Sequence, residues 1–191
     1  LVLVNERNKI SENYSVSVMA VENGQYVDER CCSQLKAMIS DCKNAGNSPV
    51  VFASYRSHEK QTLLFSNKVK ELIGQGYSNK QAKKEAGKVI AVPGTSEHEI
   101  GLAVDIVDVN YQLLDDEQEN TDTQQWLMKN CWKYGFILRY PQNKKDITGV
   151  IYEPWHYRYV GRKNAKKIMK QGLCLEEYLQ MEILGKESDD E

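Results

Sequence analysis

Apolar residues recur at three- and four-residue intervals in the first half of the chain, the spacing that places side chains on one face of a helix. In the first such segment they are Leu35, Met38, Ile39 and Cys42. Asp28 near the start and Gly46 beyond the end are typical boundaries, so the pattern predicts a helix from Asp28. A second helix begins after Ser57, whose hydroxyl can cap it. A third begins at the capping box of Ser78 and Gln81.

Short apolar runs between the helices predict buried strands. They cover residues 50–53, 103–107 and 136–138. A helix over residues 121–134 precedes the last strand, and Gly135 ends that helix. Before the first helix, Asn23 and Gly24 are a turn signal among short strands and loops.

The order of these elements predicts the fold class. Helices mixed with short, partly hairpin-linked strands favour an α+β fold over a regular alternation of strand and helix. A chain of 191 residues suits one domain with its own core. We expect this domain to span residues 1–184, with its last helices at 162–170 and around 175–183. Residues 185–191 are expected to form a frayed, disordered acidic tail.

The charge balance argues against one class of partner. The chain has 25 Lys and Arg against 27 Asp and Glu, a net charge of −2, so we expect no nucleic-acid binding. The densest basic cluster consists of Arg162, Lys163, Lys166, Lys167 and Lys170. Its helical spacing is typical of a solvated helix face.

No apolar run approaches the length needed to cross a bilayer. The opening residues 1–4 are too short for a signal peptide and lack its basic flank. A signal or an N-terminal membrane anchor outside this chain therefore stays open.

The five cysteines are an odd number and lack the paired spacing of a zinc ribbon. Cys32, Cys42 and Cys131 fall among apolar residues of predicted helices, where cysteine behaves as a small hydrophobic side chain. We expect buried free thiols, with one disulfide as the alternative.

Two of the three histidines stand in dense polar and aromatic motifs. His98 and Asp105 belong to Ser-Glu-His-Glu-Ile-Gly-Leu-Ala-Val-Asp, and His156 follows Glu153 in Glu-Pro-Trp-His. A catalytic zinc commonly takes three ligands from His, Asp and Glu, and lowers the pKa of a bound water to about 7. Gly101 would let the backbone turn between His98 and Asp105 so that both reach one ion.

Glu153 and His156 are three residues apart, which on an ideal strand sends their side chains to opposite faces. Pro154 suits the bend that would bring both into one site. Glu153 could then accept a proton from water while His156 binds the metal. These ligand types suit zinc without excluding other divalent ions.

The motifs resemble those of one peptidase family at every fixed position. The first matches S-x-H-x-x-G-x-A-x-D and the second E-x-W-H, the signatures of the VanY-like zinc D-alanyl-D-alanine carboxypeptidases and the related LdcB- and DacB-type L,D-carboxypeptidases. Arg56, Ser57 and Gln61 look like the R-S-x-x-x-Q segment of that family. Roughly residues 50–161 are covered by these motifs.

The resemblance implies a role for seven residues. The zinc ligands would be His98, Asp105 and His156. Glu153 would be the general base, and Arg56 would stabilise the oxyanion of the tetrahedral intermediate. Gln61 and Ser96 would hold the terminal D-residue of the peptide.

The resemblance also implies a fold and a substrate. The fold would be a small α+β domain like that of hedgehog and the D-Ala-D-Ala peptidases, with helices packed on a largely antiparallel central sheet and the zinc in a cleft. The substrate would be the stem peptide of bacterial peptidoglycan or its precursor, cut to release a terminal D-alanine. This places the enzyme outside the membrane, anchored or secreted.

Three other functions stay open from the sequence. The protein could be an L,D-carboxypeptidase on tetrapeptide stems, a cell-wall endopeptidase, or a non-catalytic wall-binding protein. Glu153 argues against the last, because a pure binder needs no base. Of the remaining polar residues, His58 and Asp108 match no fixed motif position and are expected to be structural. Arg139 and Arg158 either support the site from behind or serve the fold alone.

Overall fold

The centre of the fold is a four-stranded antiparallel sheet in the order β3-β4-β6-β5. Its strands are β3 (Pro49–Ala53), β4 (Ala103–Asp108), β5 (Phe136–Leu138) and β6 (His156–Tyr159). The structure, a computed structural model, describes residues 1–189, with the side chains of residues 1–184. All three predicted strands are present and β6 joins them, so the predicted α+β class is confirmed.

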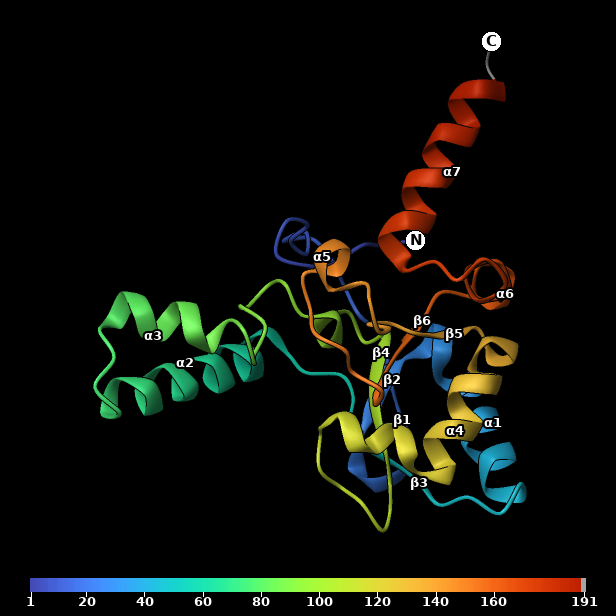
Figure 1. Ribbon diagram of the computed structural model, residues 1–191, viewed down its shortest axis with the longest axis horizontal. Coiled ribbons are helices and arrows are strands. Elements are labelled where there is room, and N and C mark those ends of the chain that lie inside the picture. The colour runs from blue at the N-terminus through green and yellow to red at the C-terminus, as the bar shows by residue number, and fades with distance from the viewer. Residues whose placement is uncertain (190–191) are drawn as a thin grey trace.

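Helices α1 (Glu29–Asn44) and α4 (Asp122–Asn130) pack against this sheet (Figure 1). Asp28 caps α1, because its carboxylate accepts a hydrogen bond from the backbone N–H of Arg30. The core between the helices and the sheet includes Leu35, Met38, Ile39, Val51, Val104, Ile106 and Leu127. Every residue of β4, the strand that contains Asp105, is buried.

The predicted helix over residues 121–134 is divided in two. α4 ends at Asn130, and the 3-10 helix η4 (Cys131–Tyr134) completes the segment before Gly135, whose φ is 87°. The Asn130 side-chain amide donates to the Trp126 carbonyl at 2.8 Å. Such a bond offers the backbone an alternative to the regular helical ladder, which accounts for the break.

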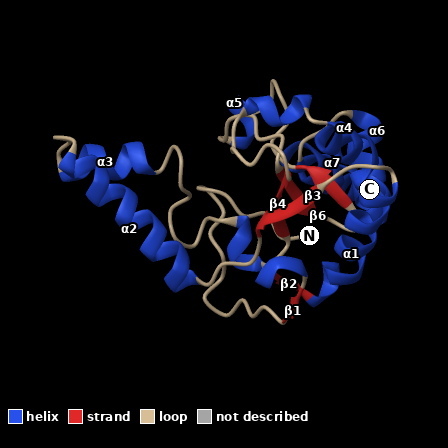
Figure 2. Ribbon diagram, turned by 90° about the horizontal axis from the view of Figure 1, so that it is seen from below, coloured by secondary structure: helices blue, strands red, loops and turns tan. Residues whose placement is uncertain are grey.

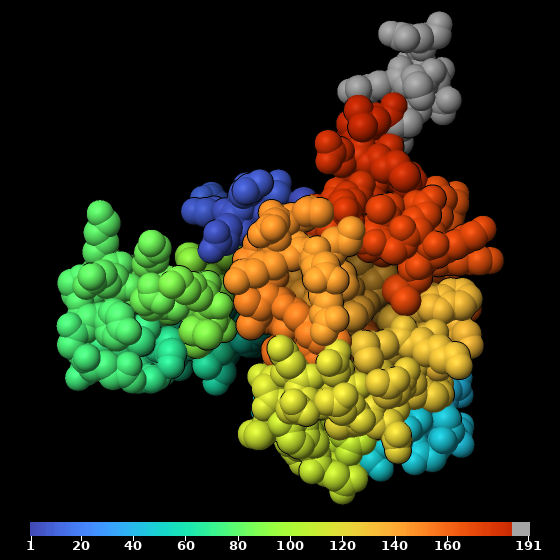
Figure 3. Space-filling view, in the orientation of Figure 1, coloured from blue at the N-terminus to red at the C-terminus, as the bar shows by residue number. Residues whose placement is uncertain are grey.

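Helices α2 (His58–Gly74) and α3 (Asn79–Ala86) form an arm that projects from the body of the molecule (Figures 1 and 2). Ser57 caps α2 and the predicted capping box starts α3. The arm has its own small hydrophobic cluster, formed by Phe65, Val69, Leu72, Ala82 and Ala86. In the space-filling view the arm projects to the left of the body, and the outline of the molecule is concave between the arm and the lower part of the body (Figure 3).

The N-terminal part of the chain contains a short hairpin. The N-terminal hairpin consists of β1 (Val18–Ala20), the 3-10 helix η1 (Glu22–Gly24) and β2 (Tyr26–Asp28). Asn23 and Gly24 have φ of 59° and 68°, which confirms the predicted turn.

The C-terminal half adds shorter elements and two further helices. They are η2 (Glu97–Ile100), η3 (Asp116–Asn120), α5 (Lys145–Thr148), α6 (Arg162–Gln171) and α7 (Leu175–Asp189). α6 and α7 pack through Ile168, Leu175 and Tyr178 against the β5 end of the sheet. The predicted tail begins inside α7, and its residues 190–191 lie outside the described part of the chain.

All five cysteines are free and buried, which the apolar surroundings predicted for Cys32, Cys42 and Cys131. Burial raises the pKa of the Cys31, Cys42 and Cys131 thiols to about 12, so these thiols stay protonated at neutral pH. Among residues 1–189, no helix is both long and apolar enough to pass through a membrane.

Candidate metal centre and active site

Sheet register places two of the predicted ligands side by side. Asp105 of β4 pairs directly with His156 at the start of β6, so the two side chains leave the same face of the sheet at adjacent strands. Next to them, the backbone N–H of Ile106 donates to the Trp155 carbonyl at 2.9 Å and fixes this register. The strand pairing therefore positions half of the site before any side-chain contact is made.

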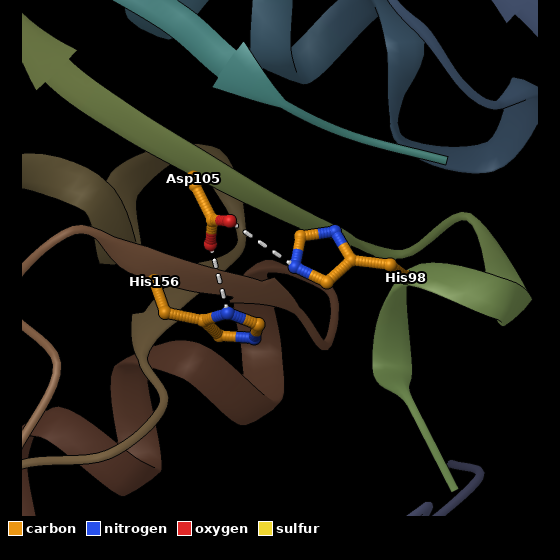
Figure 4. Close-up of side chains that lie close together, drawn as sticks. All are labelled: His98, Asp105 and His156. Atoms are coloured by element: carbon orange, nitrogen blue, oxygen red, sulfur yellow. Dashed lines mark hydrogen bonds and ion pairs between the residues drawn. The ribbon is translucent and has the colours of Figure 1, made fainter. Parts of the chain in front are cut away.

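His98 comes from the other side, on the short helix η2 that precedes β4 (Figure 4). Gly101 reverses the chain between η2 and β4 with φ of 69°. A Cβ at this position would lie 2.9 Å from Val16 Cγ1 and 3.0 Å from the Asp28 backbone nitrogen. Both the left-handed backbone and the close approach of the N-terminal segment require glycine there.

We expect Gly101→Ala to destabilise the fold by more than the roughly 1–3 kcal/mol of a strained left-handed residue, because the new methyl group also meets backbone. Urea unfolding of the metal-free protein measures this. Gly149→Ala is the matched control, since φ is 78° there but nothing lies within 4 Å of the added carbon. Equal losses in the two variants would contradict the packing argument.

The three side chains converge on one point. His98 Nε2 lies 3.3 Å from Asp105 Oδ2, and His156 Nδ1 lies 2.9 Å from Asp105 Oδ1. One ligand atom from each residue falls within 4.8 Å of the others, and all three residues are buried. The two imidazole rings meet edge to face with centroids 5.0 Å apart. The structure thus brings the predicted ligand set together.

The hydrogen bonds of His98 test whether these residues suit a metal. Its Nδ1 lies 2.9 Å from the Ser54 carbonyl, which can only accept, so Nδ1 carries the proton and Nε2 offers a lone pair beside Asp105. His156 directs Nδ1 at the same carboxylate, while its Nε2 is buried without a hydrogen-bond partner in the described chain. Two nitrogens and a carboxylate aimed at one point fit a zinc ion.

The electrostatics of the site keep its acid ionised. Burial raises the pKa of the Asp105 carboxyl, but the two histidines more than offset this and hold it below its usual range. Burial lowers the pKa of His98. Burial also opposes the charged form of His156, yet the carboxylates of Asp105 and Glu97 raise its pKa to about 9. A divalent cation would therefore displace a proton from His156 on binding.

Glu153 lies beside the ligands without belonging to the set. The backbone N–H of His156 donates to its carbonyl at 3.2 Å, which closes the turn predicted at Pro154. Glu153 Oε2 is 3.7 Å from His156 Nδ1, and its side chain is 22% exposed, more than those of the ligands. Burial raises the pKa of Glu153 to about 7, although the charge of His156 lowers it. A carboxylate with this pKa can accept and return a proton near neutral pH.

Arg56 lies three residues after the end of β3, next to His98. Its backbone N–H donates to the His98 carbonyl at 3.2 Å. Burial lowers the pKa of the guanidinium, while Asp105, Glu99 and Glu153 raise it. Its Nε is buried and has no hydrogen-bond partner within the described residues. A buried donor in this setting is available to a ligand.

Gln61 and Ser96 are more loosely tied to the ligands. Gln61 is buried on α2 and its amide donates to the Ala91 carbonyl at 2.7 Å, while its Oε1 has no partner in the described chain. Ser96 is the N-cap residue of η2, two residues before His98, and is also buried. No hydrogen bond between described side chains joins Gln61 to the three ligands.

Glu97 was not predicted as a site residue, because it stands at a variable position of the first motif. Its side chain is completely buried, and one of its oxygens accepts from Arg139 at 2.7 Å and from Arg158 at 2.6 Å. Burial raises the pKa of the Glu97 carboxyl, but the two guanidinium groups hold it below its usual range. Only the proximity of an acid to a motif histidine could have drawn attention to it in the sequence.

His58, expected to be structural, also lies near the motif. Its Nδ1 is 2.8 Å from Glu99 Oε1, and Glu99 accepts from the Gly94 backbone N–H at 2.9 Å. The pair ties the start of α2 to the loop before η2. The His58 ring is 64% exposed, and its ion-pair partner is Glu99, which is not one of the three ligands.

Two imidazoles, one carboxylate and an adjacent base define the candidate site of a metal-dependent hydrolase. The family model described as VanY, D-alanyl-D-alanine carboxypeptidase, matches residues 24–162. The chain belongs to this family.

Known relatives agree with this membership. The D-alanyl-D-alanine carboxypeptidase of Enterococcus faecalis (strain ATCC 700802 / V583) is 45% identical over 182 residues, 95% of this chain and 66% of that protein. The chain thus spans about two thirds of the length of that relative.

Two solved structures are similar over most of the chain. A vancomycin resistance D,D-pentapeptidase VanY in complex with Zn(II) has a TM-score of 0.80 at 45% identity, covering 93% of this chain and 97% of that one. The LD-carboxypeptidase LdcB has a TM-score of 0.79 at 36% identity, covering 93% and 84%.

Proposed function

We propose that this protein is a zinc-dependent D,D-carboxypeptidase that removes the terminal D-alanine from peptidoglycan stem peptides or their precursors. The observation that carries the proposal is the buried set of His98, Asp105 and His156, with Glu153 Oε2 only 3.7 Å from His156 Nδ1. Family membership supports the substrate class.

In this proposal the three ligands hold zinc through His98 Nε2, a carboxylate oxygen of Asp105 and His156 Nδ1, the atoms that already face one another. A zinc ion bound there supplies a Lewis acid that acidifies water and polarises the scissile carbonyl. The Ser54 carbonyl holds the His98 ring in the tautomer that this requires.

Glu153 accepts the proton of the attacking water and returns it to the leaving amine. Its position beside the ligands supports this role, and so does a pKa raised to about 7, because one group must act first as base and then as acid.

Arg56 stabilises the negative charge that develops on the carbonyl oxygen, for which its free, buried Nε is suited. We expect Arg56→Gln to lower kcat by roughly 10²–10³-fold, the cost of losing one oxyanion donor. Steady-state kinetics of D-alanine release measure this, with Arg56→Lys to separate charge from guanidinium geometry. An increase in KM with kcat unchanged would instead assign Arg56 to ground-state binding.

Gln61 and Ser96 hold the terminal residue of the peptide. The unpartnered Gln61 Oε1 supports this assignment, because a buried amide oxygen without a donor is ready to accept an N–H from a bound peptide.

The peptidase domain spans residues 1–184, since Val2 and Glu176, near its two ends, both bond to arginines behind the site. We place its action outside the cytoplasmic membrane, anchored or secreted, because the proposed substrate is part of the cell wall.

L,D-carboxypeptidase activity is the second candidate, favoured by the 36% identity to LdcB. The test is mass-spectrometric detection of D-alanine released from matched pentapeptide and tetrapeptide stems by zinc-loaded protein, with Glu153→Ala as the control. Release from the pentapeptide alone is expected. Release from the tetrapeptide alone would establish the second candidate, and equal release by Glu153→Ala would contradict both.

A further inference from the structure

Three charged side chains lie directly behind His156 with no access to solvent. Glu97, Arg139 and Arg158 are each 0% exposed. Arg139 Nε and Arg158 Nη1 donate to the same oxygen, Glu97 Oε1, at 2.7 and 2.6 Å. The other oxygen, Oε2, is left out of both ion pairs.

The free oxygen of Glu97 faces the histidine. Glu97 Oε2 lies 3.6 Å from His156 Nε2, and each of these buried atoms has no hydrogen-bond partner among the described residues. One is an acceptor and the other a ring nitrogen that can carry a proton. Buried polar groups in proteins nearly always find partners, and a small rotation of the ring would join these two.

We propose that Glu97 is a positioning residue for the metal centre: it accepts the Nε2–H of His156 and thereby fixes Nδ1 as the unprotonated nitrogen that faces Asp105 and the metal. The part of this inference that concerns zinc rests on the proposed function. Nothing in the family motifs assigns a role to this residue, which stands at a variable position of the first motif.

The arginines hold Glu97 in place for this task. Both bind Oε1, so they fix the carboxylate plane and turn Oε2 toward the ring. Arg139 is held from behind by Glu176 of α7 in a two-pronged ion pair at 2.9 and 2.7 Å. Arg158 donates to the Val2 carbonyl at 2.6 Å. A carboxylate gripped in this way has a single orientation, which a positioning residue requires.

The alternative is that Glu97 serves only as a counter-ion for two buried arginines. The two roles differ in what they predict for the metal. A counter-ion affects folding, whereas a positioning residue also sets metal affinity and ligand geometry.

The experiment compares zinc affinity, measured by competition with a chelator, and the visible spectrum of the Co(II) form. Glu97→Asp keeps the negative charge for the arginines but withdraws the carboxylate by one methylene from His156. Glu97→Gln keeps the shape and removes the charge. Glu176→Gln is the matched control, because it weakens the same network without touching the histidine.

We expect both Glu97 variants to bind zinc about 10–100-fold more weakly and to change the Co(II) spectrum, as loss of a hydrogen bond to a ligating histidine does. Glu176→Gln should lower only the thermal midpoint. A folded Glu97→Asp protein with wild-type zinc affinity and spectrum would overturn the inference.

Nitrogen NMR of the zinc-loaded wild-type protein decides the question even if the variants fail to fold. His156 is expected to carry its proton on Nε2, and a proton on Nδ1 would overturn the inference. These readouts use no substrate. A wild-type protein that binds zinc but releases no D-alanine would remove the proposed function and leave the assignment of Glu97 standing.

Discussion

Glu153→Gln is expected to lower kcat by roughly 10²–10⁴-fold while zinc stays bound, because the amide cannot accept the proton of the attacking water. The substitution keeps the shape of the side chain, and Glu153 is not among the three converging ligands. D-alanine release gives the rate, and atomic emission gives the zinc content of the same sample. Glu85→Gln is the control and should retain full activity, because Glu85 is a partly exposed acid that pairs with Lys88 on the arm.

The pH profile gives a second view of the same residue. Burial raises the pKa of Glu153 to about 7 in the metal-free site, and a bound cation would lower it from there. Because the base acts in its ionised form, kcat/KM should fall tenfold per pH unit below that pKa and level off above it. An acidic limb that survives unchanged in the residual activity of Glu153→Gln would assign it to another group.

Metal removal is expected to abolish D-alanine release, and added zinc should restore it. Without a cation, Asp105 and two histidines remain buried against one another, so zinc should also raise the thermal midpoint of the protein. At a free zinc concentration of 1,000 times Kd the added stability is about 4 kcal/mol. Differential scanning calorimetry with and without zinc measures this.

In His98→Ala, zinc should neither restore D-alanine release nor raise the thermal midpoint, because the substitution removes one of three ligands. Asn164→Ala is the control, because the hydrogen bonds of the Asn164 side chain to described residues go to Val160 and Tyr178, away from the ligands. Release of D-alanine that persists after chelation, or in His98→Ala, would contradict a metal mechanism.

Much of the sheet could be predicted because most of its strands have a local sequence pattern. The run at residues 50–53 is short, apolar and bounded by turns, and the structure has β3 (Pro49–Ala53) there. The place where α4 ends could not be predicted from periodicity, because Asn130 breaks the helix through a side-chain bond that leaves the apolar spacing unchanged.

The candidate site divides along similar lines. His98, Asp105 and His156 could be predicted from the two sequence motifs and their resemblance to the family signatures, and the structure brings them together. Glu97 was not, because its importance depends on two arginines 42 and 61 residues away in sequence. Such long-range ion pairs leave no local sequence pattern, and an acidic residue without a motif is normally expected to be exposed to solvent. The sequence left open whether Arg139 and Arg158 support the site or serve the fold alone. In the structure both donate hydrogen bonds to Glu97.

The hydrogen bonds that Arg158 donates to the Val2 carbonyl and Arg139 donates to Glu176 also bear on the smallest piece of this chain that can fold. A fragment trimmed to residues 24–162 would contain the sheet and the complete ligand set. It would nevertheless strip both buried guanidinium groups of their outer partners and uncover Ile137, Val160 and the cluster beneath α7. Uncompensated buried charge is strongly destabilising. We therefore expect the autonomous folding unit to be larger than the segment that carries the recognisable motifs.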